Sequence, residues 1–280
     1  WSQHRRSLPI QPIITLILSS CINTEVNNST SEDIDMGIKM GTPKTTGGQD
    51  ANLTIQNASF SSKSFDVSSE DNSPQDVTFN NNGTRMFVMG SGSDTIYQYN
   101  LSAAYDLTSA SFSNISFSVS SEEDQPNSVT FDTIGSRMFV VGIANDKIRQ
   151  YNLGTNFDIA TASFTGNSFD VSSEEDRPES IAFNADGTRM FIVGRNNDKV
   201  HQYNLGTAFD ITTASFNANF DVSSEDADPR GIEFNSIGTR MFIVGTFNNK
   251  IYQYNLGTGF DITTASFSGK AFYPSSEDNG

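Results

Sequence analysis

The chain has 280 residues, which is enough for one large domain or for an array of repeats. Its 33 Asp and Glu outnumber its 17 Lys and Arg, and the formal net charge of −16 argues against nucleic acid as a partner. One Cys and two His leave no disulfide framework within the chain and no Cys/His zinc site.

The N-terminal residues 1–20 have the layout of a secretory signal peptide. Arg5 and Arg6 precede an apolar stretch, Ile10 to Leu18, which is too short to span a membrane comfortably. The run ends Leu18-Ser19-Ser20-Cys21 and resembles the bacterial lipobox. This resemblance implies cleavage before Cys21 and a diacylglycerol on its sulfur, hence an extracytoplasmic lipoprotein at the outer membrane or cell surface. The alternative is an ordinary signal peptide followed by an incidental Cys.

Residues 21–56 follow as a polar stretch rich in Asn, Ser, Thr and Gly. Such a composition predicts a disordered tether that carries the lipidated Cys21. Its root-mean-square reach would be roughly 30–35 Å. Membrane contact is therefore expected through the lipid anchor only.

The remaining residues, 57–280, contain an internal repeat. The segment Gly83 to Val88 recurs from Gly135, Gly187 and Gly238, at spacings of 52, 52 and 51 residues. Tyr99-Asn100-Leu101 recurs in step, beginning at Tyr151, Tyr203 and Tyr254. A fixed period of this length is typical of stacked structural units.

Each copy predicts four short strands, in the first copy Asp76–Asn80, Arg85–Met89, Thr95–Leu101 and a last one around Ser111–Val119. Asn82-Gly83 supplies the positive φ of a tight hairpin. The second strand is apolar on both faces, as expected of a strand between two layers. We therefore predict an all-β fold, a β-propeller of four-stranded antiparallel blades with four complete repeats of about 52 residues.

The fourth strand varies in length between copies. Phe117 follows Phe112 by five positions, and Phe169 follows Phe164 by five. Phe220 follows Phe216 by only four positions. Because one extra residue flips the side chains to the other face, the longer copies are predicted to carry a β-bulge, near Gly166 in one of them. The short copy is predicted to run straight.

The predicted ring contains an extra outer strand. Residues 57–68 match a fourth strand without the first three before it, and residues 275–280 match the loop that precedes each first strand. A ring of four blades would leave this leading strand redundant. We therefore expect the four copies to belong to a larger ring, of up to seven blades.

The repeat resembles the YVTN-type propeller repeat. The resemblance is carried by Pro126, Val129-Thr130-Phe131, Gly135 to Gly142 and Ile148 to Leu153, and it covers roughly residues 57–280. Met-Phe-Val stands where the family has Tyr-Val-Thr, and the unit is longer. The resemblance implies an extracytoplasmic propeller, commonly seven-bladed, without a single function, since relatives include surface-layer and adhesion-type proteins and, more distantly, lactonases.

Acidic pairs lie in the loops before the first strands: Glu70, Asp71, Glu122, Glu123, Glu174, Glu175, Glu225 and Asp226. These loops should share one face of a propeller, and hard oxygen ligands suit Ca²⁺. The alternative is that Ser-Glu-Asp runs are turn and solubility sequences. Calcium is the only cofactor that the sequence suggests.

Loop positions that differ between otherwise near-identical copies are candidates for recognition. They are Ser73, Gln125, Arg177 and Asp228 in the acidic loop, together with Arg195 and Phe247. The residue after the repeated Pro also varies, as Gln75, Asn127, Glu179 and Arg230. The alternative is neutral drift at exposed sites.

Other repeated polar residues suit structural roles. Arg85, Arg137, Arg189 and Arg240 share one repeat position and are expected to pair with an acid or a loop carbonyl. Asp106 and its three equivalents are expected to form Asx-type turns. His201 is expected to be an exposed strand residue rather than a base, so no catalytic residue is assigned.

The sequence therefore favours a surface-anchored binding or adhesion scaffold, with a protein or glycan at the cell surface as its partner. One alternative is a lactonase-like hydrolase, which would need a distinctive constellation of side chains in one blade. The other is a structural surface or fibre component.

Overall fold

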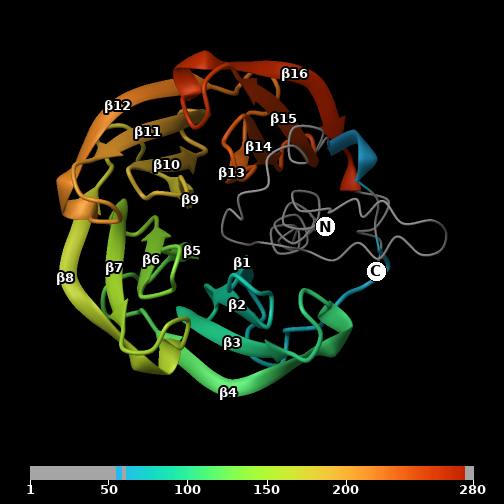
Figure 1. Ribbon diagram of the computed structural model, residues 1–280, viewed down its shortest axis with the longest axis vertical. Coiled ribbons are helices and arrows are strands. Elements are labelled where there is room, and N and C mark those ends of the chain that lie inside the picture. The colour runs from blue at the N-terminus through green and yellow to red at the C-terminus, as the bar shows by residue number, and fades with distance from the viewer. Residues whose placement is uncertain (1–54, 59–60, 275–280) are drawn as a thin grey trace, which may run out of the picture.

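A computed structural model describes residues 55–58 and 61–274. Four sheets of four antiparallel strands stand around a common axis (Figure 1). The fold is an all-β propeller with four blades, as predicted. The predicted signal peptide, Cys21 and most of the predicted tether lie outside the described residues.

The blades have nearly identical strand bounds. Blade 1 comprises β1 (Pro74–Phe79), β2 (Arg85–Gly90), β3 (Thr95–Leu101) and β4 (Ala110–Ser118). Blade 2 comprises β5 (Pro126–Phe131), β6 (Arg137–Gly142), β7 (Lys147–Leu153) and β8 (Ala162–Asp170). Blade 3 comprises β9 (Pro178–Phe183), β10 (Arg189–Gly194), β11 (Lys199–Leu205) and β12 (Ala214–Asp221). Blade 4 comprises β13 (Pro229–Phe234), β14 (Arg240–Gly245), β15 (Lys250–Leu256) and β16 (Ala265–Phe272).

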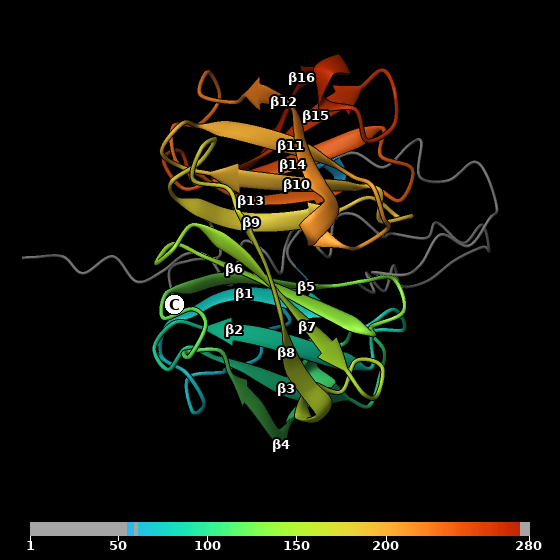
Figure 2. The same cartoon turned by 90° about the vertical axis from the view of Figure 1, so that its left-hand side faces the viewer.

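Each blade runs outward from the axis in chain order. The first strands β1, β5, β9 and β13 lie nearest the axis, and β4, β8, β12 and β16 form the rim (Figures 1 and 2). The second strands are buried from their second residue onward, because a blade packs against each of their faces. The rim strands alternate between partly buried and exposed side chains, since only one of their faces is covered.

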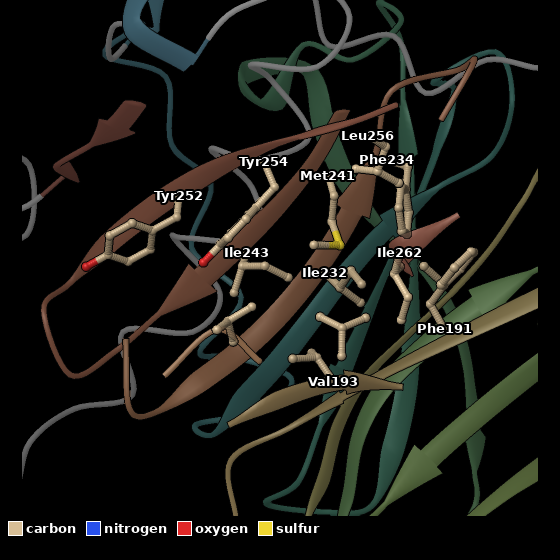
Figure 3. Packing of buried hydrophobic residues seen from close by; sticks show 13 residues of the cluster. Phe191, Val193, Ile232, Phe234, Met241, Ile243, Tyr252, Tyr254, Leu256 and Ile262 are labelled. Carbon is tan, nitrogen blue, oxygen red and sulfur yellow. The ribbon is translucent and has the colours of Figure 1, made fainter. Parts of the chain in front are cut away.

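The hydrophobic core lies between the blades. In the cluster that joins blades 3 and 4, Phe191 and Val193 of β10 face Ile232 of β13 and Met241 and Ile243 of β14 (Figure 3). The rings of Phe191 and Phe234 contact each other at a tilt of 45°, with centroids 4.5 Å apart. Burying one such side chain stabilises the fold by about 1.5–3 kcal/mol, so each blade depends on its neighbour.

The repeated Arg also joins neighbouring blades. Arg85 donates from Nη1 to the carbonyl of Phe157 in blade 2 at 2.7 Å, and Arg137 donates to the carbonyl of Phe209 in blade 3 at 3.1 Å. The predicted structural role, with a loop carbonyl as partner, is confirmed for these residues.

A short 3-10 helix precedes each rim strand: η3 (Leu107–Ser109), η4 (Ile159–Thr161), η5 (Ile211–Thr213) and η6 (Ile262–Thr264). The carboxylate of Asp106 accepts a hydrogen bond from the Thr108 amide at 3.0 Å and caps η3. The predicted Asx-type turn is therefore confirmed. The sequence did not predict the helices themselves.

The rim strands differ from the prediction in one respect. In blade 2, Arg149 pairs with Ser168 but Tyr151 with Phe164, and Gly166 adopts φ +83° in the resulting irregularity, as predicted. In blade 3, Gln202 pairs with Ala218 and Tyr203 with Phe216, which leaves one extra residue. The prediction that this short copy runs straight is wrong. This strand carries a one-residue bulge: Phe216 and Phe220 are four positions apart, but their partners Tyr203 and Val200 on β11 are only three apart.

The leading segment is not a β-strand. Its described part begins with η2 (Ile55–Asn57) and passes along the rim from blade 4 to blade 1 without joining a ladder (Figure 1). Ile55 is fully buried, so the folded body reaches at least two residues before the predicted boundary at residue 57. Blade 4 has its own rim strand, β16, and does not use this segment to complete its sheet.

Candidate functional site: an axial pocket lined by side chains that differ between blades

The second acid of each predicted metal pair is buried and holds two loops together. Glu175 is fully buried, and its Oε1 accepts hydrogen bonds from the amides of Arg177 at 3.0 Å and Asn196 at 3.3 Å. Asp226 accepts from the amides of Asp228 at 3.0 Å and Phe247 at 3.2 Å. Asp71 and Glu123 make equivalent bonds. These carboxylates therefore join the loop before the first strand to the loop after the second.

The first acid of each pair accepts a hydrogen bond from a buried tyrosine. The Tyr99 hydroxyl lies 3.1 Å from Glu70 and the Tyr254 hydroxyl 3.1 Å from Glu225, and Glu122 and Glu174 are contacted in the same way. Burial raises the pKa of Tyr99, and the negative charge of Glu70 raises it further. No group of three or more potential metal-ligating side chains occurs within residues 55–58 and 61–274. Calcium binding by these loops stays a prediction.

His201 is not an exposed strand residue. Its exposure is 2%, and its Nε2 lies 3.8 Å from Oε2 of Glu175. In blade 2 the equivalent Arg149 lies 3.9 Å from Oε2 of Glu123. The expectation of exposure is wrong because the neighbouring loop covers this face of β11. The residue at this repeat position differs between blades 2 and 3, but in both blades its side chain is buried beside a buried carboxylate and not exposed on the surface.

The variable residue after each repeated Pro lies at the axis. Gln75, Asn127, Glu179 and Arg230 come from β1, β5, β9 and β13, and all four line one pocket between the inner strands. In every blade the ladder between the first two strands is irregular at this residue. Because a bulged residue leaves the regular alternation, its side chain can be re-aimed, here towards the pocket. One position of the repeat thus supplies four different side chains to a single site.

The side of the pocket formed by blades 3 and 4 is charged. Glu179 is 3% exposed and accepts a hydrogen bond from Nδ2 of Asn127 at 3.1 Å. It pairs with Nε of Arg195 at 3.1 Å and with Nη1 of Arg230 at 3.6 Å. Burial raises the pKa of Glu179 to about 7, although the Arg230 charge opposes the shift. Arg230 also donates to both carboxylate oxygens of Asp228, at 2.9 and 3.1 Å.

On the side formed by blade 1, Gln75 supplies a neutral amide beside two serine hydroxyls. Nε2 of Gln75 donates to the Ser91 hydroxyl at 2.8 Å, and the Ser91 and Ser73 hydroxyls lie 3.1 Å apart. The pocket therefore combines the amide and hydroxyl groups around Gln75 with the carboxylate of Glu179 and the guanidinium group of Arg230.

Two further carboxyl groups line the pocket. Asp76 accepts hydrogen bonds from the Ser128 hydroxyl at 2.7 Å and the Val129 amide at 3.0 Å, and burial raises its pKa to about 6. Burial raises the pKa of Glu233 to about 7, with a contribution from the Asp76 charge. Both side chains keep some exposure to solvent although protein atoms surround them. Acids with such pKa values exchange protons near neutral pH.

The predicted recognition residues fall into two groups. Ser73, Arg195 and Asp228 bond to residues that line the pocket. Gln125, Arg177 and Phe247 do not line it, and the Phe247 side chain is 70% exposed. The sequence singled out Glu179 and Arg230 as variable positions but gave no role to Asp76 or Glu233. The available signal was the variation after the repeated Pro in an otherwise constant strand.

No helix in the described part of the chain is both long and apolar enough to cross a membrane.

Comparisons with known proteins show the fold alone. No protein-family model and no curated protein matches the sequence, so the resemblance to the YVTN repeat stays a prediction. A candidate 6-phosphogluconolactonase from Bacteroides uniformis is 12% identical with a TM-score of 0.50, and the match covers 71% of this chain and 55% of that one. A similar protein from Bacteroides fragilis is 14% identical with a TM-score of 0.49, at the same coverage of 71% and 55%. A periplasmic gluconolactonase from Pseudomonas aeruginosa is 13% identical with a TM-score of 0.46, covering 71% and 53%. The matches thus span about half the length of these proteins, and the chain is similar to them as a β-propeller.

Proposed function

We propose that the protein is a binding scaffold whose axial pocket recognises a hydroxyl-rich ligand, a glycan fragment. The observation that carries this proposal is the convergence of Gln75, Asn127, Glu179 and Arg230 in one pocket while the surrounding repeat is almost constant. Amides, carboxylates and guanidinium groups offer donors and acceptors side by side, which suits sugar hydroxyls.

The charge arrangement supports a polar ligand rather than an apolar one. Glu179 and Arg230 are held by partners on both sides, so their polar atoms keep fixed positions without a ligand. A preorganised set of polar groups loses little entropy when it binds. A ligand that replaces water on these groups must supply hydrogen bonds of its own.

The test is a saccharide binding screen with the full chain and with Arg230→Ala. We expect a saccharide that binds the wild type and whose affinity falls at least about tenfold in the variant, since charge-assisted hydrogen bonds are lost. Lys147→Ala is the matched control, because it removes a positive charge that does not line the pocket: Lys147 of β7 lies 3.8 Å from Asp170 of the rim strand β8. Absence of any saccharide ligand, or equal affinity in all three proteins, would overturn the proposal.

A second candidate function is lactone hydrolysis, which the carboxyl groups of Asp76 and Glu233 favour. Their pKa values of about 6 and 7 suit a general base that activates water near neutral pH. Structures with this fold include proteins named as lactonases. Turnover of 6-phosphogluconolactone or gluconolactone above the spontaneous rate, abolished by Glu233→Gln, would support this activity. Rates equal to the buffer blank would exclude it for these substrates.

The cellular location is a separate proposal that rests on the N-terminal sequence. Cys21 would carry the lipid and hold the propeller outside the cytoplasm, at a bacterial surface where glycans and proteins are available as partners. Labelling with a clickable fatty acid, compared between the wild type and Cys21→Ser, tests the anchor. Equal labelling of both would refute it.

A further inference from the structure

The leading segment makes the contacts that a rim strand and its 3-10 helix make elsewhere in the ring. The amide of Ile55 donates to Oε1 of Gln253 in blade 4 at 3.0 Å. The amide of Ile262 in blade 4 donates in the same way to Gln202 of blade 3, also at 3.0 Å. η2 therefore packs on blade 4 as η6 packs on blade 3, which is the position of a following blade.

The other end of the segment contacts blade 1 as a preceding blade would. Phe65 meets Tyr99 edge to face, with centroids 5.4 Å apart at 77°. The rim residue Phe117 meets Tyr151 of the next blade at 5.5 Å and 83°. The turn that follows is also repeated, since the amides of Glu70 and Glu122 donate to Val67 and Val119 at 3.0 and 2.9 Å. Residues 55–58 and 61–71 thus occupy the rim position of a blade that stands between blade 4 and blade 1.

The inner faces beside this position remain unmatched among the described blades. In blade 3, Phe191, Val193 and Val200 pack on the first two strands of blade 4. Their equivalents in blade 4 are buried but belong to no cluster that joins described blades: Phe242, Val244 and Ile251. On the opposite side, Val77, Met86 and Val88 of blade 1 cluster with Phe65 and Val67 of the leading segment. No β13–β1 packing comparable to that of β9 on β13 joins the two ends, and the described ring is open there (Figure 1).

We infer that the ring takes a fifth blade, and that the sector between blades 4 and 1 binds a three-stranded antiparallel sheet of the same repeat type. The incoming sheet would supply the equivalents of Val77, Met86 and Val88 to Phe242, Val244 and Ile251 of blade 4. It would supply the equivalents of Phe87, Met89 and Ile96 to blade 1. The leading segment would then be its rim strand, which gives the redundant outer strand a partner.

The test adds the three inner strands to the full chain. Residues 275–279 repeat the sequence Ser-Ser-Glu-Asp-Asn that precedes Ser73 and Pro74, so a copy of residues 74–106 can follow Gly280 in register. We expect the midpoint of thermal unfolding to rise by roughly 5 °C or more, because Phe242, Val244 and Ile251 gain the contacts that Phe191, Val193 and Val200 make with blade 4. Amides of the added strands should exchange with solvent as slowly as those of β1–β3.

The matched control carries the same extension with Met86→Asp and Val88→Asp made in the added copy only. This extension should give no rise, and a protease should remove it, because the face offered to blade 4 is no longer apolar. The inference is overturned if the unmodified extension leaves the midpoint unchanged and is digested as quickly as the control. It is also overturned if Phe65→Ala in the leading segment has no effect on the stability that the extension adds.

Discussion

The carboxyl groups of Asp76 and Glu233 make the stability of the protein depend on pH. Their pKa values in the folded state are about 6 and 7, above the ordinary values of 3.8 and 4.5. Between about pH 4.5 and 7 the folded state therefore holds protons that the unfolded state has released. Stability is expected to be greatest near the low end of this window and to fall as pH rises through it.

The variant Glu233→Gln tests this expectation. It keeps the shape of the side chain but removes the charge, so it should stabilise the protein at pH 8 by on the order of 1–3 kcal/mol and have little effect at pH 5. Urea unfolding at the two pH values measures the difference. Asp124→Asn changes an exposed carboxyl in a loop and serves as the control. A stabilisation equal at both pH values would contradict the argument.

At the scale of elements, two glycines with positive φ differ in how much space a side chain would have. They therefore distinguish the cost of a steric clash from the cost of a left-handed backbone conformation. Gly135 has φ +73°, and a Cβ there would lie 2.2 Å from the Phe157 ring. Gly166 has φ +83°, and a Cβ there would meet no atom within 4 Å. The hairpin turn therefore requires glycine at residue 135 both for its positive φ and for lack of space. The bulge favours glycine at residue 166 for its positive φ alone.

We expect Gly166→Ala to cost about 1–2 kcal/mol, which is the penalty for a left-handed residue with a side chain. Gly135→Ala should cost at least about 3 kcal/mol, since the Phe157 ring must also move out of the core between blades. Denaturant unfolding of both variants gives the comparison. Equal losses would show that the contact with Phe157 relaxes without cost.

The repeat also shows which features of the strands and turns can be predicted from the sequence. The strands, the turn at Gly83 and the Asx turn at Asp106 depend on local chain chemistry. The structure has both turns where the sequence predicts them, and the strands of blade 1 begin and end within two residues of their predicted bounds. The bulge in the rim strand of blade 3 cannot be predicted from whether the number of positions between its two Phe residues is odd or even. Four steps between Phe216 and Phe220 permit a straight strand, and only pairing with β11 shows the extra residue.

At the scale of the whole molecule, the net charge of −16 predicts a dependence on salt. Self-repulsion destabilises the compact state, and added ions screen it. Raising NaCl from low to moderate concentration should therefore raise the midpoint of thermal unfolding. CaCl₂ and MgCl₂ at equal ionic strength should raise it equally if screening alone acts, because Glu175 and Asp226 already accept backbone hydrogen bonds.

Thermal unfolding in calcium, magnesium and EDTA separates screening from binding. A rise with calcium alone would contradict the screening expectation and would confirm the calcium site predicted from the acidic loops. Substitution of Glu122 or Glu174 would then locate the ligands.

The sequence by itself determined the repeat, the four-stranded blade and the ring class. A repeat of about 52 residues that forms four short strands cannot bury its apolar faces alone, and stacking against neighbouring copies is one of the few ways to bury them. Only the tertiary structure decided that His201 and Glu175 are buried, because the loops that cover them belong to separate parts of the chain. It also decided that Gln75, Asn127, Glu179 and Arg230 share a pocket. These residues lie about one repeat apart in sequence, and the distance between them is set by the packing of whole blades around the axis rather than by any local pattern.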